Sequence, residues 1–304
     1  MKSWLLLLAC NFMWALQFTC IKLVEDQVGP LFTVWGPMFL ATLLLYPFVR
    51  SERSLDGAKV YGRKSNFLLY GALVVFGVLP GQMLVTWGTR LTLASNGALI
   101  MLTLPVCTAL MAFVFLGEKM NLVRWLSFAI AIAGVVMCSG QDLRGFDLGT
   151  SHLAGNLLIF SGVLGSAFYN SYGKKALERH TPMRMCFYTY IGMLVLMLPF
   201  VLIQERDVLA RIPQFSARTW MGLGLLTFFH NFLSMVLFLK ALKALDAIQA
   251  TLSNYLITVF GVPIAAIWLG ERLAPLAVVG GLLVLSSTLI ISVWENLNSK
   301  RVSA

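Results

Sequence analysis

The sequence predicts an all-α integral membrane protein in which ten transmembrane helices form two inverted five-helix repeats around a central cavity. Three observations predict this fold: a strongly apolar composition, recurring apolar windows of membrane-spanning length, and a resemblance between the two halves of the chain. The 304 residues are 59% apolar and 12% charged, with a mean hydropathy of +0.81. Soluble domains are about 45–50% apolar and about 25% charged. The composition therefore excludes a soluble enzyme, a disordered chain and a secreted disulfide scaffold.

Ten apolar windows are long enough to cross the hydrocarbon layer, which takes about 20 helical residues. They lie at 4–24, 31–49, 67–87, 94–116, 122–140, 154–173, 183–203, 219–240, 246–268 and 274–294. The loops between them are too short to hold a soluble domain. The first window lacks a cleavage site of small residues, so we expect it to be retained as a span.

Lysine and arginine residues predict the orientation of these windows. With both termini in the cytoplasm, 16 of the 23 basic residues fall on the cytoplasmic side and 7 on the other, as the positive-inside rule requires. The same rule accounts for the net charge of +10, so we expect membrane lipid and a small solute as partners, and no nucleic acid. The five cysteines lie in apolar stretches without a CxxC pair, which predicts buried thiols and no metal or other cofactor.

The second half of the chain repeats the first at an offset of 152 to 153 residues. Pro30 corresponds to Pro182 at the offset of 152. Leu116–Lys119 corresponds to Leu269–Arg272 at the offset of 153, because one residue is inserted in between. Each copy of this LGE[KR] tetrapeptide ends the fourth span of its half. Because five is an odd number, the second half enters the membrane in the opposite sense, which is typical of alternating-access transporters. We expect the two repeats at 1–141 and 152–294, followed by a cytoplasmic tail at 295–304.

Two five-span units that each carry LGE[KR] resemble the EamA-type branch of the drug/metabolite transporter superfamily. Trp14 in the first window and Pro30 at the start of the second fit the same pattern. The resemblance implies a basket in which spans 1, 3, 4, 6, 8 and 9, with parts of 2 and 7, surround a cavity and spans 5 and 10 lie outside. It also implies transport of amino acids, nucleosides, sugars or drugs, often outward. Many members carry an Arg early in the second span, where this chain has Pro37 and, in the second copy, Thr189, so that role is not carried over.

Polar side chains concentrate in the same six spans, 1, 3, 4, 6, 8 and 9. In lipid, a polar side chain needs a partner or a function. We expect the amides and aromatic rings to line a cavity suited to a small amphipathic or zwitterionic solute. The alternative is bonding between packed helices, at about 0.6–2 kcal/mol for each bond. The candidate cavity-lining residues are Asn11, Trp14, Gln17, Gln82, Thr86, Asn96, Tyr169, Asn170, His230, Asn231, Ser253, Asn254 and Tyr255.

His230 is the only ionisable residue that falls near the centre of a window, since all 13 carboxylates lie in loops or at window ends. One interpretation is a substrate contact or a proton-coupling site, because histidine titrates near neutral pH. The alternative is a neutral ring bonded to Asn231 or to neighbouring backbone. The lack of an embedded carboxylate argues against a cation/proton antiporter.

Two further groups of residues have structural interpretations. Pro80, Gly81, Pro105 and Pro263 are hinge candidates, or else kinks that shape the bundle. In the LGE[KR] motifs, which include Gly117, Glu118, Gly270 and Glu271, we expect each glutamate to pair with the adjacent cation at a helix end, Lys119 or Arg272. A gating contact with the opposite half is the alternative.

The function predicted from these observations is a secondary, alternating-access transporter that exports amino acids or related small polar metabolites across a bacterial inner membrane. Efflux of drugs or larger amphipathic compounds is the alternative. A membrane enzyme is disfavoured because no HxxxxD, HExxH or aspartate-rich motif is present, so no catalytic residue is predicted. A non-transporting scaffold would instead have a dry centre. A monomer suffices, since one chain supplies both halves.

Overall fold

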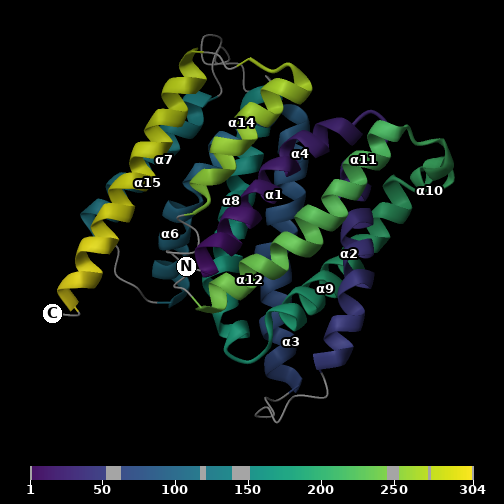
Figure 1. Cartoon of the computed structure of the whole chain (residues 1–304), viewed down its shortest axis with the longest axis horizontal. Coiled ribbons are helices and arrows are strands. Elements are labelled where there is room, and N and C mark those ends of the chain that lie inside the picture. Colours follow the sequence, from purple (N-terminus) through teal and green to yellow (C-terminus); the bar gives the residue numbers. More distant parts are fainter. Residues whose placement is uncertain are drawn as a thin grey trace.

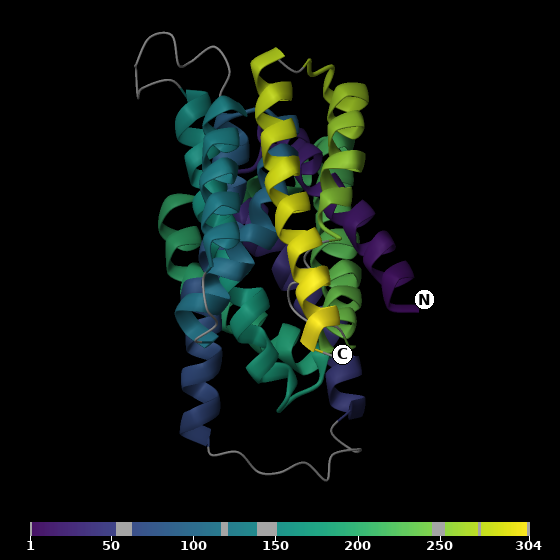
Figure 2. The same ribbon diagram turned by 90° about the vertical axis from the view of Figure 1, so that its left-hand side faces the viewer.

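The protein is an all-helical bundle in a computed structural model that describes residues 2–52, 63–116, 121–138, 151–244, 253–272 and 275–302. Within those residues it contains helices and no strands (Figure 1). Most of the helices run along one common direction (Figure 2). The motif residues Gly117 and Glu118 lie outside the described residues, and so does the side chain of Tyr255.

The first half of the chain forms the helices that hold the first five apolar windows. In order they are α1 (Lys2–Val24), α2 (Pro30–Glu52), α3 (Arg63–Ala72), the π-helix η2 (Leu73–Val78), α4 (Leu79–Leu91), α5 (Ala94–Ile100), the 3-10 turn η3 (Met101–Thr103), α6 (Leu104–Leu116) and α7 (Leu122–Cys138). The segments α3, η2 and α4 follow one another without a break, and so do α5, η3 and α6.

The second half follows the same plan with one addition. It forms α8 (Ser151–Leu177), α9 (Pro182–Gln204), α10 (Asp207–Arg211), η5 (Ile212–Gln214), α11 (Ala217–Leu225), the π-helix η6 (Leu226–Ser234), α12 (Met235–Ala244), α14 (Tyr255–Leu269) and α15 (Pro275–Val302). The short α10 and η5 occupy the loop after α9 and were not predicted from the sequence.

Seven helical segments of the described chain are long and apolar enough to cross a membrane. They are Leu5–Val24, Pro30–Glu52, Asn66–Leu91, Ala94–Met111, His152–Leu177, Pro182–Gln204 and Ala217–Lys243. The apolar stretches Leu256–Leu269 in α14 and Val278–Ser287 in α15 are shorter, and α7 has 17 residues. The total of ten spans therefore stays a prediction.

Local sequence determines where several helices begin and end. Pro182 starts α9, and the hydroxyl oxygen of Thr181 accepts a hydrogen bond from the backbone N–H of Arg184, 3.3 Å away. Ser216 caps α11 in the same way by accepting from Thr219, at 3.2 Å. The motif residue Gly270 ends α14 with a φ of 68°, a left-handed conformation that glycine adopts without steric cost.

The two halves pack closely where α4 crosses α8. A Cβ added to Gly88 would lie 2.5 Å from the carbonyl oxygen of Gly155, and one added to Gly155 would lie 2.7 Å from that of Gly88. Small residues at such a crossing let two helix backbones approach closely. Away from this crossing, α7 and α15 pack against each other at one side of the bundle (Figure 1).

The helices α2 and α9, which correspond under the sequence repeat, lie side by side and run in opposite directions. At one end, the carboxylate of Glu205 accepts hydrogen bonds from the backbone N–H groups of Leu31, at 3.0 Å, and Phe32, at 2.8 Å. At the other end, the hydroxyl of Thr181 donates to the carboxylate of Glu52. The start of each helix is therefore joined to the end of the other.

Candidate functional site

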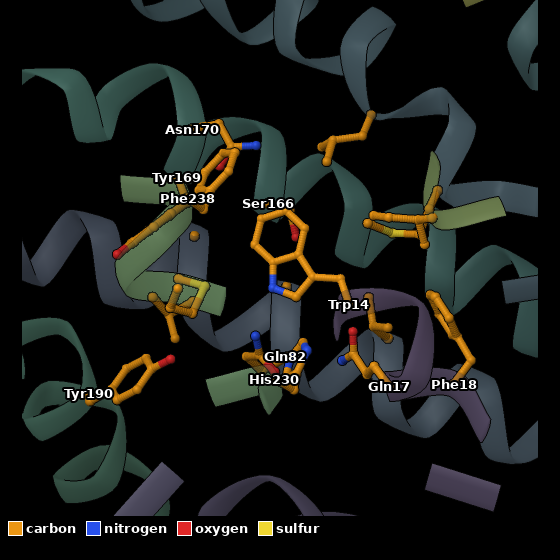
Figure 3. Close-up of a pocket in the computed structure, with 18 residues that line it drawn as sticks. Trp14, Gln17, Phe18, Gln82, Ser166, Tyr169, Asn170, Tyr190, His230 and Phe238 are labelled. Carbon is orange, nitrogen blue, oxygen red and sulfur yellow. The ribbon is translucent and has the colours of Figure 1, made fainter. Parts of the chain in front are cut away.

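A cavity of about 80 Å³ lies inside the bundle (Figure 3). Most of its wall comes from α1, η2, α4, α8, η6 and α12, and η3, α6, α9 and α14 add one residue each. The lining residues are Trp14, Gln17, Phe18, Gly77, Val78, Gly81, Gln82, Val85, Met101, Leu104, Ser166, Tyr169, Asn170, Tyr190, His230, Met235, Phe238 and Ile257. This set combines aromatic rings with uncharged polar groups and contains no carboxylate.

Six of the predicted cavity-lining residues meet in this wall: Trp14, Gln17, Gln82, Tyr169, Asn170 and His230. In Figure 3 the indole of Trp14 lies between Ser166 on one side and Gln82 and His230 on the other. The hinge candidate Gly81 also lines the cavity. Residues from both halves thus surround a single space.

Polar atoms with unused hydrogen-bonding capacity belong to two of these residues. The side chain of His230 is buried, and neither of its ring nitrogens has a hydrogen-bond partner within the described part of the chain. The same holds for the indole nitrogen of Trp14. An unsatisfied buried polar group costs about 1–3 kcal/mol, so these atoms are ready to bond a solute.

Other predicted lining residues are engaged in contacts between or within helices. The amide nitrogen of Asn11 donates to the carbonyl of Leu7, at 2.7 Å, and to the hydroxyl of Ser253, at 2.9 Å, and so joins α1 to the segment before α14. The amide of Asn96 donates to the hydroxyl of Thr92, at 3.1 Å. The Asn11 contact therefore joins separate segments of the bundle, whereas the Asn96 contact is local to the start of α5.

Three more predicted positions lie outside the cavity wall. Thr86 is buried in α4, and Asn254 is buried at the start of α14. Asn231 donates from its amide to the carbonyl of Leu226, 2.8 Å away. Its own backbone carbonyl accepts a hydrogen bond of 2.7 Å from the hydroxyl of Tyr190. Asn231 therefore joins η6 to Tyr190, a residue of the cavity wall.

The prolines suggested as hinges sit at changes in helix geometry. Pro80 is the second residue of α4 and follows the π-helix η2, and Pro105 is the second residue of α6 and follows the 3-10 turn η3. Pro263 differs, because it is exposed within α14 and faces Val278 and Leu282 of α15.

The sequence repeat accounts for most of the cavity wall, including residues that were not predicted. The offset of 152 matches Trp14 with Ser166, Gln17 with Tyr169, and Phe18 with Asn170. The offset of 153 matches Gly77 with His230, Gln82 with Met235, Val85 with Phe238, and Leu104 with Ile257. The repeat was the signal that would have identified Phe18, Gly77, Ser166 and Met235. The wall residue Tyr190 has no such partner in the wall, because its counterpart is Met38.

Chemistry differs between the members of these pairs. Under the sequence repeat, His230 corresponds to a glycine, Ser166 to a tryptophan and Gln82 to a methionine. The two halves therefore present unlike faces to the same space.

Two π-helices border the cavity at corresponding positions. η2 begins at Leu73 and η6 begins at Leu226, which are 153 residues apart. A π-helix breaks the regular pattern of helical hydrogen bonds and occurs often at functional sites. Here the two segments place Gly77 and His230 on the wall.

One end of the bundle is closed by contacts between helix ends. The carboxylate of Glu271, just after α14, accepts hydrogen bonds from the backbone N–H groups of Ala94, at 2.8 Å, and Ser95, at 2.9 Å, and from the hydroxyl of Ser95, at 2.7 Å. The sequence predicts an ion pair between this carboxylate and Arg272. The structure instead uses it to cap α5 of the opposite half, because a helix N-terminus offers unpaired N–H groups to an anion.

Arg90 makes further contacts at the same end. Its guanidinium donates to the backbone carbonyls of Val28, at 2.6 Å, and Glu25, at 2.8 Å, while its own carbonyl accepts from Lys22, at 3.0 Å. The ammonium of Lys22 also lies 3.2 Å from the carboxylate of Glu25. These contacts join the end of α4 to the loop between α1 and α2.

Both halves of the chain match the EamA-like transporter family, over residues 1–140 and 153–293. The chain belongs to this family. It is a multi-pass membrane protein, and the family and its relatives are named as transporters rather than as enzymes.

Named relatives and one solved structure resemble this EamA-family chain. It is 28% identical, over 71% of its length and 70% of the relative, to a "Probable terminal-alkyne amino-acid exporter" of Streptantibioticus cattleyicolor. It is 24% identical, over 96% and 94%, to the "Uncharacterized transporter YyaM" of Bacillus subtilis. A solved structure described as "Crystal structure of protein" shares the fold, with a TM-score of 0.64 at 13% identity, over 100% of this chain and 99% of that one.

Proposed function

We propose that this EamA-family transporter exports amino acids or related small polar metabolites by alternating access, with the substrate held in the central cavity. The observation that carries the proposal is the cavity wall, which is built from corresponding positions of both halves and holds uncharged polar and aromatic side chains. Transporters made of inverted repeats bind substrate where their halves meet. The amino-acid exporter among the relatives supports this substrate class.

The inverted arrangement is supported by the pairing of α2 with α9. These corresponding helices run antiparallel, with Glu205 joined to Leu31 at one end and Thr181 joined to Glu52 at the other. Other helix contacts also follow the repeat. The helix α1 packs on α14, and their counterparts in the other half, α8 and α6, pack on each other. On this basis we propose repeats at 1–141 and 152–294, and ten spans.

The size and charge of the cavity favour a small substrate without net charge. Its volume of about 80 Å³ is roughly half that of an engineered protein cavity of about 150 Å³ that admits benzene. A zwitterion has no net charge, and the wall supplies hydrogen-bonding groups in place of a counter-ion.

We assign the substrate contacts to the six predicted residues that line the cavity, with His230 and Trp14 supplying the unused polar atoms. The other predicted positions whose side chains the structure describes, Asn11, Thr86, Asn96, Asn231, Ser253 and Asn254, act through packing in this assignment. Because no carboxylate lines the wall, a proton-coupled cycle depends on His230. We also propose that both termini lie in the cytoplasm, as the excess of basic residues on that side indicates, and that the protein acts as a monomer in an inner membrane.

The test is counterflow in proteoliposomes loaded with single amino acids, followed by a panel that includes nucleosides, sugars and a cationic drug. Saturable exchange of an amino acid that is lost in Trp14→Ala supports the proposal. Exchange of the drug alone would favour the efflux alternative. No saturable flux of any small polar solute would overturn the assignment.

A further inference from the structure

A second hollow lies on the outside of the bundle, between α3 and η2 on one side and α9 on the other, and has a volume of about 590 Å³. In Figure 1, α3 and α9 lie next to each other at the lower edge of the molecule. The groove is separate from the central cavity and shares no lining residue with it. The family assignment gives it no role.

Most of the groove is apolar and faces outward. Phe67, Val75 and Val195 are exposed along it, although each belongs to a predicted span. Gly71 forms part of its floor, and a Cβ built there meets no atom within 4 Å. The groove therefore has room for an aliphatic chain running between the two helices.

One end of the groove is polar. The rings of Tyr70, Tyr188 and His180 cluster there, with 5.3 Å between the centroids of the two tyrosines and 5.6 Å between those of Tyr70 and His180. The hydroxyl of Tyr70 and the side-chain oxygen of Asn66 are buried and have no hydrogen-bond partner among the described residues. A donor and an acceptor are thus available beside an apolar channel.

The polar end is also positively charged. Arg184 lies on α9 one helical turn before Tyr188, so these two residues share a face, and His180 lies in the turn just before the helix. Between residues 174 and 184 the chain carries four cations, Lys174, Lys175, Arg179 and Arg184, and one carboxylate. This end of the groove is where α3 and α9 begin, at the side that the sequence places in the cytoplasm.

We propose that this groove binds an anionic glycerophospholipid, with an acyl chain between η2 and α9 and the phosphate beside Tyr70 and Arg184. Basic pockets between transmembrane helices at the cytoplasmic side bind anionic lipid headgroups. The hydroxyl of Tyr70 donates to the phosphate, and Asn66 accepts from a headgroup hydroxyl. The lipid contacts the outer face of η2, whose residues Gly77 and Val78 line the central cavity.

The test measures lipid binding directly, without transport, so its outcome is independent of the substrate assignment. The full-length protein is reconstituted in nanodiscs of equal parts phosphatidylglycerol and phosphatidylcholine, released into mild detergent, and weighed by native mass spectrometry. We expect one retained phospholipid, with phosphatidylglycerol at least fivefold over phosphatidylcholine. Its addition should also raise the Tm of the delipidated protein.

Three variants locate the site. Gly71→Leu fills the groove and should remove the retained lipid and the Tm shift. Gly224→Leu is the matched control, because Gly224 is exposed on α11 and also has open space around it. Arg184→Gln should keep a lipid in the groove but lower the preference for phosphatidylglycerol at least threefold.

Two results would overturn the proposal. Equal lipid retention by Gly71→Leu and Gly224→Leu would show that the lipid binds elsewhere. Equal retention of both phospholipids by the unmodified protein would show ordinary annular lipid. If Gly71→Leu instead blocked transport without changing the retained lipid, the groove would be a lateral path for substrate.

Discussion

The carboxylate of Glu271 and the hydroxyl of Ser95 are joined by a hydrogen bond of 2.7 Å that links the second half of the chain to the first. The same carboxylate also accepts from the backbone N–H of Ser95, at 2.9 Å, and of Ala94, at 2.8 Å. The glutamate of the second LGE[KR] motif is thus the N-terminal cap of a helix in the other repeat. This contact closes one end of the bundle.

Glu271→Gln removes the charge from this cap and one of its acceptor oxygens. Hydrogen bonds to charged groups contribute about 1.5–3 kcal/mol, so we expect the free energy of unfolding to fall by roughly that amount. A lower Tm in detergent measures the loss. Asp207→Asn is the control, since this carboxylate is exposed on α10 and should leave the Tm unchanged. Equal Tm values for the two variants would contradict the capping role.

Ser95→Ala tests the same cap from the other side. It removes the hydroxyl bond but leaves both backbone N–H groups bonded to Glu271. We therefore expect a smaller loss, of about 0.5–1.5 kcal/mol, measured as a smaller fall in Tm. A loss larger than that of Glu271→Gln would mean that Ser95 has another role.

Asn11 and Gln17 lie on the same helix and are both amides, yet the structure gives them different tasks. Asn11 is fully buried and bonded to Ser253 and Leu7, whereas Gln17 lines the cavity. Asn11→Ala should lower the Tm and leave the KM for substrate unchanged. Gln17→Ala should raise the KM and leave the Tm nearly unchanged. Counterflow kinetics and thermal melts of the two variants, measured in parallel, check this division.

That pair shows what the sequence predicts and where it stops. Hydropathy and the repeat locate the helices, because burial in lipid forces long apolar stretches. The same reasoning also finds Trp14, Gln17, Gln82 and His230 in the wall. It cannot separate Asn11 from Gln17, since an amide bonded to another helix and an amide facing a cavity look alike in a sequence.

Other parts of the site depend on backbone geometry that hydropathy does not encode. The π-helices η2 and η6 shift the register of hydrogen bonds in otherwise ordinary apolar windows. Tyr190 contributes to the wall from the seventh window, which was expected to border the cavity only in part, and the sequence did not single out this residue. Its hydroxyl bonds the carbonyl of Asn231, a contact that only the folded chain creates.

His230→Gln should affect transport more than stability. His230 lines the cavity, and its ring nitrogens have no hydrogen-bond partner among the described residues, so losing a bond to substrate worth about 1–2 kcal/mol raises the KM by about 5- to 30-fold. If coupling passes through this ring, a pH gradient should drive flux in the unmodified protein and not in the variant, while counterflow persists in both. His152→Gln, at the start of α8 and away from the cavity wall, is the control. A variant with unchanged KM would remove His230 from the substrate site.

Gly88→Ala should destabilise the crossing of α4 and α8, because the added Cβ would lie 2.5 Å from the carbonyl oxygen of Gly155 and 2.9 Å from the backbone nitrogen of Ile159. Backbone atoms cannot move aside as a flexible side chain can, so the two helices must separate. Overpacking of this kind costs about 1–3 kcal/mol. Gly224→Ala makes the same change where nothing lies within 4 Å, and there the better helix propensity of alanine should add about 0.5–1 kcal/mol. Opposite shifts in Tm confirm that the close approach of α4 and α8 at this glycine contact stabilises the protein, whereas similar shifts would contradict it.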